Sequence, residues 1–375
     1  MKTAVLYCQE LKEYDFGPGH PFRGDRYEIF PKFLKENLPE DDNYRILKAE
    51  WTTEEDLSLV CQKDYIDFTR DYFKTANLGL SFDGRFRQYH SEDNRPRGRP
   101  GKLEEAARLI IGQAKMAVDL IQKGEFKKVV SLGGGMHHAS PDCGDGFCIY
   151  NDVAFAAKYL MGKYGLERIL ILDTDAHAGN GKSVHTGTCG YFYSDPKVLF
   201  IDLHQDPRTI YPRAGFISEI GEGEGRGYTI NIPLPKFAGD NSYKLVFDQI
   251  IFPVVKEFKP QIIIRNGGSD PHFADKLTQL GLTLEGLKMI GQKVRELSKI
   301  CDGKVVDLIG SGYNIQVLPY AWLALISGLA NWKIKIEEPF PMANKRFQKD
   351  HSLEKTKIVI QEIKRILKDY WKCLR

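Results

Sequence analysis

The sequence predicts an α/β protein with a mostly parallel sheet that helices cover. From Lys102 onward, short runs rich in Val, Ile and Leu alternate with longer segments whose apolar residues recur at helical spacing. The composition, 42% hydrophobic and 27% charged, is that of a folded protein with a core. Disordered, fibrous and membrane-embedded classes are therefore disfavoured.

The elements follow one another in a regular order. The β-branched apolar runs predict strands over residues 127–133, 168–173, 197–204, 228–234, 261–266 and 304–310. The helical periods predict helices over residues 102–124, 151–165, 240–258, 283–299, 316–332 and 352–372. Asn151 and Thr283 are expected N-caps, and Pro253 is expected to break its helix late. No linker of biased composition separates these elements, so residues 1–375 are predicted to form a single domain.

Charge and cysteine content restrict the cellular context. The formal net charge is +3, too small to imply a nucleic acid partner, and no apolar run is long enough for a membrane span. The seven cysteines are scattered and include no CxxC pair, which argues against a disulfide framework. The N-terminus lacks a secretory signal pattern, so we expect a cytoplasmic protein.

The Arg-rich segment from Arg85 to Lys102 is predicted to be a solvated loop, or alternatively a rim that contacts an acidic or polar partner.

Polar clusters directly follow four predicted strands. They are GGGMHH (133–138), TDAHAGNG (174–181), GGSD (267–270) and SGY (311–313). Ligands of open α/β sheets bind outside the carboxyl ends of the strands. If the four strands are neighbours, the clusters converge on one edge of the sheet.

The contents of these clusters suit a divalent metal. Asp175 and His177 are two residues apart, so an extended backbone points both side chains to the same face. Asp270 can supply a third ligand from another strand end. Two carboxylates and one imidazole leave coordination positions open, as in catalytic zinc sites. Asp173 is expected to orient a neighbouring histidine.

The remaining polar residues suit acid–base chemistry. In a hydrolysis the attacking water must lose a proton and the leaving group must gain one, and imidazole has the pKa closest to working pH. His137 and His138 are therefore candidate acid–base groups. Tyr313 follows a loop of small residues and could donate its hydroxyl to a developing oxyanion.

In this order and spacing, the motifs resemble those of the histone deacetylase family. The matching stretches are YDFGPGHPFRGDR, LGGGMHHAS, GFCIYNDVAFA, LDTDAHAGNG, FIDLH, NGGSDPHFADKLTQLGLT and IGSGYN. They span nearly the whole chain. The resemblance implies a single-domain three-layer αβα protein of the arginase/deacetylase fold. It also implies a zinc-dependent hydrolase of N-acyl amides, acting on acetylated lysine in a protein or on a small acyl-amine such as an acetylpolyamine.

The resemblance also implies roles for individual residues. Asp175, His177 and Asp270 would hold Zn2+, with Fe2+ as an alternative. His137 and His138 would be the tandem histidines, with His138 the preferred base and acid, and Tyr313 would polarise the acetyl carbonyl. The walls of the acyl-lysine channel would be Gly146 and Phe147 on one side and Tyr211 on the other. Arg26 would line an inner cavity through which acetate leaves. A K+ ion would lie beneath the zinc, near Asp173.

Several positions depart from the family pattern. Asn180 replaces an aspartate that partners the second histidine, which should lower the basicity of His138. Ser311 replaces a glycine and could restrict the channel floor. Asp202 replaces a hydroxyl residue and should make the K+ site more negative. Arg213 places a cation near the mouth. The carboxylate that grips the substrate backbone in protein deacetylases has no secure match, Asp83 being one candidate.

Two other functions stay open. A ureohydrolase shares the fold but needs a two-manganese cluster, and Asn180 interrupts the carboxylate pattern that would bind the second ion. A non-catalytic protein that recognises acylated partners would not need all three metal ligands and Tyr313, which this chain retains. Oligomeric state is not readable from the sequence.

Overall fold

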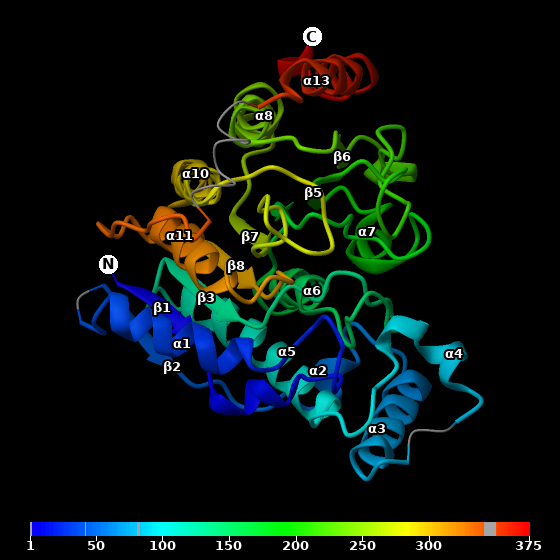
Figure 1. Cartoon of the computed structure of the whole chain (residues 1–375). Coiled ribbons are helices and arrows are strands. Elements are labelled where there is room, and N and C mark those ends of the chain that lie inside the picture. The colour runs from blue at the N-terminus through cyan, green and yellow to red at the C-terminus, as the bar shows by residue number, and fades with distance from the viewer. Residues whose placement is uncertain (1, 42, 81–82, 341–349) are drawn as a thin grey trace.

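Eight parallel strands form one sheet at the centre of the molecule (Figure 1). The computed structural model describes residues 2–41, 43–80, 83–340 and 350–375. The strand order is β2-β1-β3-β8-β7-β4-β5-β6, and every neighbouring pair is parallel. Their bounds are β1 Thr3–Leu6, β2 Tyr44–Leu47, β3 Lys128–Leu132, β4 Ile169–Asp173, β5 Val198–Gln205, β6 Thr229–Leu234, β7 Ile262–Gly267 and β8 Val305–Ile309. The predicted α/β class is confirmed, and β1 and β2 are additions to the six strands expected from the sequence.

Helices cover both faces of this sheet (Figure 1). Their bounds are α1 Arg26–Asn37, α2 Glu54–Leu57, α3 Lys63–Asn77, α4 Phe86–Tyr89, α5 Leu103–Gln122, α6 Asp152–Tyr164, α7 Gly187–Phe192, α8 Asp240–Val246, α9 Phe252–Phe258, α10 Leu284–Leu297, α11 Leu318–Ala330 and α13 Leu353–Leu367. The described helices are all too short or too polar to cross a membrane.

Alternation along the strands divides the core into two layers. In β4, Ile169 and Ile171 pack into the cluster that contains residues of α5 and α6. Leu170 and Leu172 face the other way, into the cluster that contains residues of α8, α10 and α13. Because successive side chains of a strand point to opposite faces, a strand that is apolar throughout is buried on both sides.

The helix boundaries follow local sequence signals. The side chain of Asn151 caps α6 by accepting from the backbone N–H of Ala154, and Thr283 caps α10 by accepting from Gly286. The expected break at Pro253 is wrong. A π-helical turn over Phe247–Ile251 joins α8 to α9, and Pro253 lies in the first turn of α9. Proline is tolerated there because N–H groups of a first turn lack partners in the helix.

The sheet order decides where the polar clusters meet. The strands β3, β8, β7 and β4 that precede them are consecutive neighbours. Their last residues are in register: Leu132 pairs with Ile309, Gly267 with Ile309, and Asp173 with Asn266. The four clusters therefore emerge side by side from the same edge.

Candidate active site

Asp175, His177 and Asp270 lie together at this edge, buried beneath the surface. His177 Nδ1 is 3.1 Å from Asp175 Oδ1 and 3.1 Å from Asp270 Oδ2. One ligand atom from each residue lies within 4.8 Å of the others. In the described part of the chain, no other group of three His, Cys, Asp or Glu side chains comes this close.

The two carboxylates of this trio favour a positive charge between the three side chains, either a proton on His177 or a bound cation. Burial alone lowers the pKa of His177, but the two carboxylates outweigh it and raise the pKa to about 10. Burial raises the pKa of Asp270, and the nearby Asp175 carboxylate raises it further. Two buried carboxylates facing one imidazole are a donor set that fits a divalent ion such as zinc or ferrous iron.

The tandem histidines lie beside this trio and differ from each other. His137 Nδ1 is 2.8 Å from Asp173 Oδ2, and His137 Nε2 is 3.1 Å from His138 Nε2. Burial lowers the pKa of His137, but the carboxylates of Asp173 and Asp175 raise it to about 9. Burial and the charges of His137 and His177 lower the pKa of His138 well below its usual value. At neutral pH the pair therefore combines a protonated and a neutral imidazole.

Asp173 has the orienting position expected for it. Its carboxylate accepts from the backbone N–H of Asp175 and from the side-chain amide of Asn266, in addition to its contact with His137. The lower basicity expected for His138 agrees in direction with its lowered pKa, but the contact of its ring is with the backbone of Asn180 and not with the side chain. His138 Nδ1 is 2.7 Å from the backbone carbonyl oxygen of Asn180. A backbone acceptor is available whatever the side chain, so the change from aspartate does not remove the partner of His138.

A cavity of about 420 Å³ leads to these groups from the surface. His138, His177, Gly146, Phe147, Tyr211 and Tyr313 all line it. Phe147 and Tyr313 meet edge to face with 5.8 Å between ring centroids, and Tyr211 packs against His138 at 5.1 Å. Gly146 has φ +55°, and a Cβ there would lie 2.3 Å from His138 Cδ2. The predicted wall residues thus share one aromatic pocket with His138 and Tyr313, whereas His137 does not line it, and glycine is required at position 146.

Tyr313 is held by its backbone. Its N–H donates to Asp275 Oδ2 at 2.7 Å, and Asp275 Oδ1 accepts from Leu277. Burial raises the pKa of the Tyr313 hydroxyl, and the carboxylates of Asp175 and Asp270 raise it further. The hydroxyl is therefore a proton donor at any working pH. The sequence pattern did not single out Asp275, whose only signal was its place in the motif that follows Asp270.

Arg26 lies beside the site and does not line this cavity. It is buried, donates from Nη1 to the carbonyl of Gly310 at 2.7 Å, and stacks 3.8 Å above the ring centroid of Phe22. Its guanidinium is 5.9 Å from the ring centroid of Tyr313. Arg26 lines a second cavity of about 690 Å³ to which Tyr313 also contributes.

Ser311 contacts one of the candidate metal ligands. Its hydroxyl donates to Asp270 Oδ1 at 2.7 Å, so it orients a candidate metal ligand. The added carboxylate of Asp202 is balanced, because Oδ1 is 3.0 Å from Nδ1 of the buried His204 and Oδ2 accepts from the N–H of Gly179. The sequence did not reveal the Ser311 contact, since it joins residues 41 positions apart.

The candidate Asp83 is in the wrong place. It pairs with Arg85 and lines a different cavity. Asp93 instead lines the pocket of His138 and Tyr313. No sequence signal pointed to Asp93, because this residue lies inside the Arg-rich segment and is not part of a recognisable motif.

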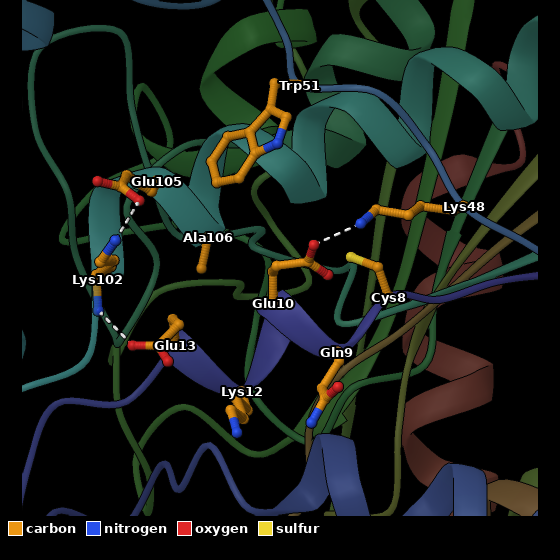
Figure 2. Close-up of a pocket in the computed structure, with 10 residues that line it drawn as sticks. All are labelled: Cys8, Gln9, Glu10, Lys12, Glu13, Lys48, Trp51, Lys102, Glu105 and Ala106. Carbon is orange, nitrogen blue, oxygen red and sulfur yellow. Dashed lines mark hydrogen bonds and ion pairs between the residues drawn. The ribbon is translucent and has the colours of Figure 1, made fainter.

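A separate cavity of about 610 Å³ lies beyond the carboxyl ends of β1 and β2 (Figure 2). No predicted site residue lines it. Its charged groups have partners: Lys48 pairs with Glu10, Lys102 pairs with Glu105, and Glu13 accepts from the backbone N–H of Lys102. Lys12 pairs with Glu28, which lies outside the cavity lining.

Comparison with known proteins decides the family. The model of the histone deacetylase domain matches residues 20–329. The chain belongs to the histone deacetylase family. A probable deacetylase of Archaeoglobus fulgidus is 36% identical over 382 aligned residues and is covered completely, as is this chain. The acetoin utilization protein AcuC of Staphylococcus xylosus is 37% identical over 330 residues, which cover 86% of this chain and 82% of that protein.

A solved structure supports the fold of this deacetylase. The crystal structure of the HDA15 HD domain superposes with a TM-score of 0.81 at 23% identity, covering 100% of this chain and 97% of that one. The predicted three-layer arrangement is therefore that of the family.

Proposed function

We propose that this deacetylase hydrolyses the side-chain amide of acetylated lysine in proteins, using a divalent metal held by Asp175, His177 and Asp270. The observation that carries the proposal is the pocket in which His138, His177 and Tyr313 face one cavity between Phe147 and Tyr211. An aromatic passage of this kind suits the apolar stem of an acyl-lysine, with the amide at its inner end.

The residues divide the chemistry among them. When bound, the metal supplies Lewis-acid polarisation of the acyl carbonyl and acidifies water. His138 is the preferred base because its imidazole is neutral at working pH and lines the cavity. His137, held by Asp173, lies 3.1 Å away, and burial together with the charge of His137 lowers the pKa of His138 and so keeps that imidazole neutral before the reaction. The protonated His138 imidazole then gives its proton to the leaving amine nitrogen as the C–N bond breaks. The Tyr313 hydroxyl donates a hydrogen bond to the oxyanion.

Other parts of the pocket would position the substrate. Asp93 is the better candidate for holding the substrate backbone, since it lines the pocket and Asp83 does not. Gly146, Phe147 and Tyr211 would enclose the acyl-lysine stem. Arg26 would receive the released acetate on the inner side.

The remaining expectations stay predictions. A K+ ion near Asp173 would be bound mainly by backbone carbonyls. The Asp173 carboxylate already contacts His137 and two N–H donors, and the Asp202 carboxylate already contacts His204 and one N–H donor. A cytoplasmic location is expected. We also propose that residues 1–375 form one catalytic domain, since a single sheet contains all the described strands.

The proposed function is tested by acetate release from an acetyl-lysine peptide. We expect zinc-loaded enzyme to release acetate and chelator-treated enzyme not to do so. Tyr313→Phe should lower kcat about a hundredfold or more, because it removes one oxyanion donor. Its metal content and thermal unfolding should match those of the wild type. Turnover at the wild-type rate would remove Tyr313 from the mechanism.

A further inference from the structure

The Arg-rich segment from Arg85 to Lys102 is folded against the active-site surface. The backbone N–H of Arg97 donates to the carbonyl of Phe16 at 2.7 Å, and that of Gly101 donates to Asp15 at 2.8 Å. Gly17 has φ +97°, and a Cβ there would lie 1.8 Å from the carbonyl oxygen of Arg97. The segment is therefore held close against the loop that precedes α1.

Four of the five arginines in this segment already have partners. Arg85 pairs with Asp83, Arg87 and Arg95 pair with Glu92, and Arg97 donates to the carbonyl of Gly19. Arg99 is exposed and has no hydrogen bond or ion pair within the described residues. It lines the 690 Å³ cavity that Tyr313 and Leu277 also line.

Two more cations are exposed and lack a partner within the described chain, as Arg99 does. Lys276 lines the same cavity as Arg99, and Arg213 lines the active-site pocket. Both are exposed, and neither has an ionic or hydrogen-bonding partner in the described part of the chain. Tyr313 and Leu277 line both cavities, so the two openings are adjacent. We call Arg99, Lys276 and Arg213 the mouth cations.

The carboxylates of these two cavities are already engaged. Asp15 accepts from the N–H groups of Gly17 and Gly24, Asp25 pairs with Arg23, and Asp93 accepts from the hydroxyl of Ser91. These hydrogen bonds do not remove the negative charges of Asp15 and Asp93. Among the described residues of the two cavities, the charged side chains without any protein partner are nevertheless the three mouth cations. The cavity in Figure 2 differs, since lysines and glutamates that line it pair with each other.

We propose that the mouth cations select acetyl-lysine in acidic segments of protein, with Asp or Glu within a few residues of the acetylated side chain. This inference rests on the proposed function and names its substrate class. Carboxylates beside the acetyl-lysine would meet three unpaired cations, and complementary charge raises the rate of encounter and the specificity. An acetylpolyamine carries ammonium groups and would be repelled by the same cations.

The test compares three acetyl-lysine peptides of equal length, flanked by Glu, Gln or Lys, together with acetylspermidine. We expect kcat/KM to fall in the order Glu, Gln, Lys, with about a tenfold difference between the extremes at low salt, given the strength of exposed ion pairs. The difference should shrink toward unity at about 0.5 M salt, because salt screens exposed charges. Acetylspermidine should be the poorest substrate.

Variants assign the preference to particular residues. The triple variant Arg99→Glu, Lys276→Glu and Arg213→Glu should reverse the order of the peptides. The control Lys355→Glu makes a single reversal of charge on α13, at an exposed lysine outside both cavities, and should preserve the order. An equal or better rate with Lys-flanked peptide or acetylspermidine in the wild type would overturn the inference, as would an unchanged order in the triple variant.

A binding measurement separates this inference from the proposed function. Fluorescence anisotropy should show that metal-loaded Tyr313→Phe protein binds the Glu-flanked peptide about tenfold more tightly than the Lys-flanked peptide at low salt. If no substrate is hydrolysed but this difference is found, the proposed hydrolysis fails and the charge selection stands. Equal binding of the two peptides contradicts the charge selection.

Discussion

Single side chains around the metal trio have separable tasks. Asp175, His177 and Asp270 are the candidate metal ligands, whereas Ser311 and Asp275 contact the groups beside them. Ser311 donates to Asp270, and Asp275 accepts from the backbone of Tyr313. Groups of the second kind keep the ligands and the oxyanion donor in one orientation, which preorganises the site.

The Ser311 contact yields a prediction about metal affinity. Ser311→Gly should weaken zinc binding about tenfold, because Asp270 loses the donor that orients it. Competition with a chromophoric chelator measures this directly. Ser327→Ala is the matched control, since that buried hydroxyl bonds a helix carbonyl elsewhere. Equal zinc affinity in Ser311→Gly and the wild type would show that the hydrogen bond has no such effect.

At the scale of elements, the site depends on the contact between β7 and β8. Arg265 and Asp307 are register partners in these strands and form a buried ion pair. Arg265 also donates to Thr174 at 3.4 Å. The segments that follow these strands carry Asp270 and Tyr313, so this pair holds together the candidate metal ligand and the proposed oxyanion donor.

Breaking this pair should cost stability. Arg265→Met should lower the free energy of unfolding by about 3–5 kcal/mol, because Asp307 would be buried without a partner. The double variant Arg265→Met with Asp307→Leu should recover most of the loss, since no buried charge remains. Urea unfolding measures both. Arg365→Met, which breaks an exposed pair with Glu362 on α13, should change the midpoint little. A small loss in the first variant would mean that water reaches Asp307.

For the whole molecule, a buried histidine links stability to pH. His90 is fully buried against α3, where its Nε2 is 3.0 Å from the hydroxyl of Thr69, and burial lowers its pKa to about 3. In the unfolded chain the pKa returns to about 6.5. The unfolded state then binds more protons below pH 6.5, so stability is lost as the pH falls from about 6.5 toward 3.

This linkage predicts a specific slope. Between neutral pH and pH 4.5, the titration of His90 alone should cost roughly 2–3 kcal/mol of unfolding free energy. His90→Phe should remove that part of the pH dependence, whatever its effect on stability at neutral pH. His185→Gln is the control, because His185 is exposed. The same slope in His90→Phe and the wild type would assign the acid sensitivity to other groups.

The sequence by itself determined the fold class, six of the eight strands and the residues proposed for the metal site. Period-2 and period-3.6 patterns are local, and motifs at strand ends converge whenever parallel strands are neighbours. It missed β1 and β2, which are only four residues long.

Only the tertiary structure decided the contacts between distant segments. The Ser311 hydroxyl donates to Asp270, and the ring of His138 contacts the backbone carbonyl of Asn180. Asp93, and not Asp83, lines the pocket. Arg99 lines a cavity with Tyr313 and has no partner among the described residues. The identity of a side chain is written in the sequence, but its partner depends on how the strands and loops pack. Charge selection at the mouth is a property of that packing, because only folding shows which arginines are already paired.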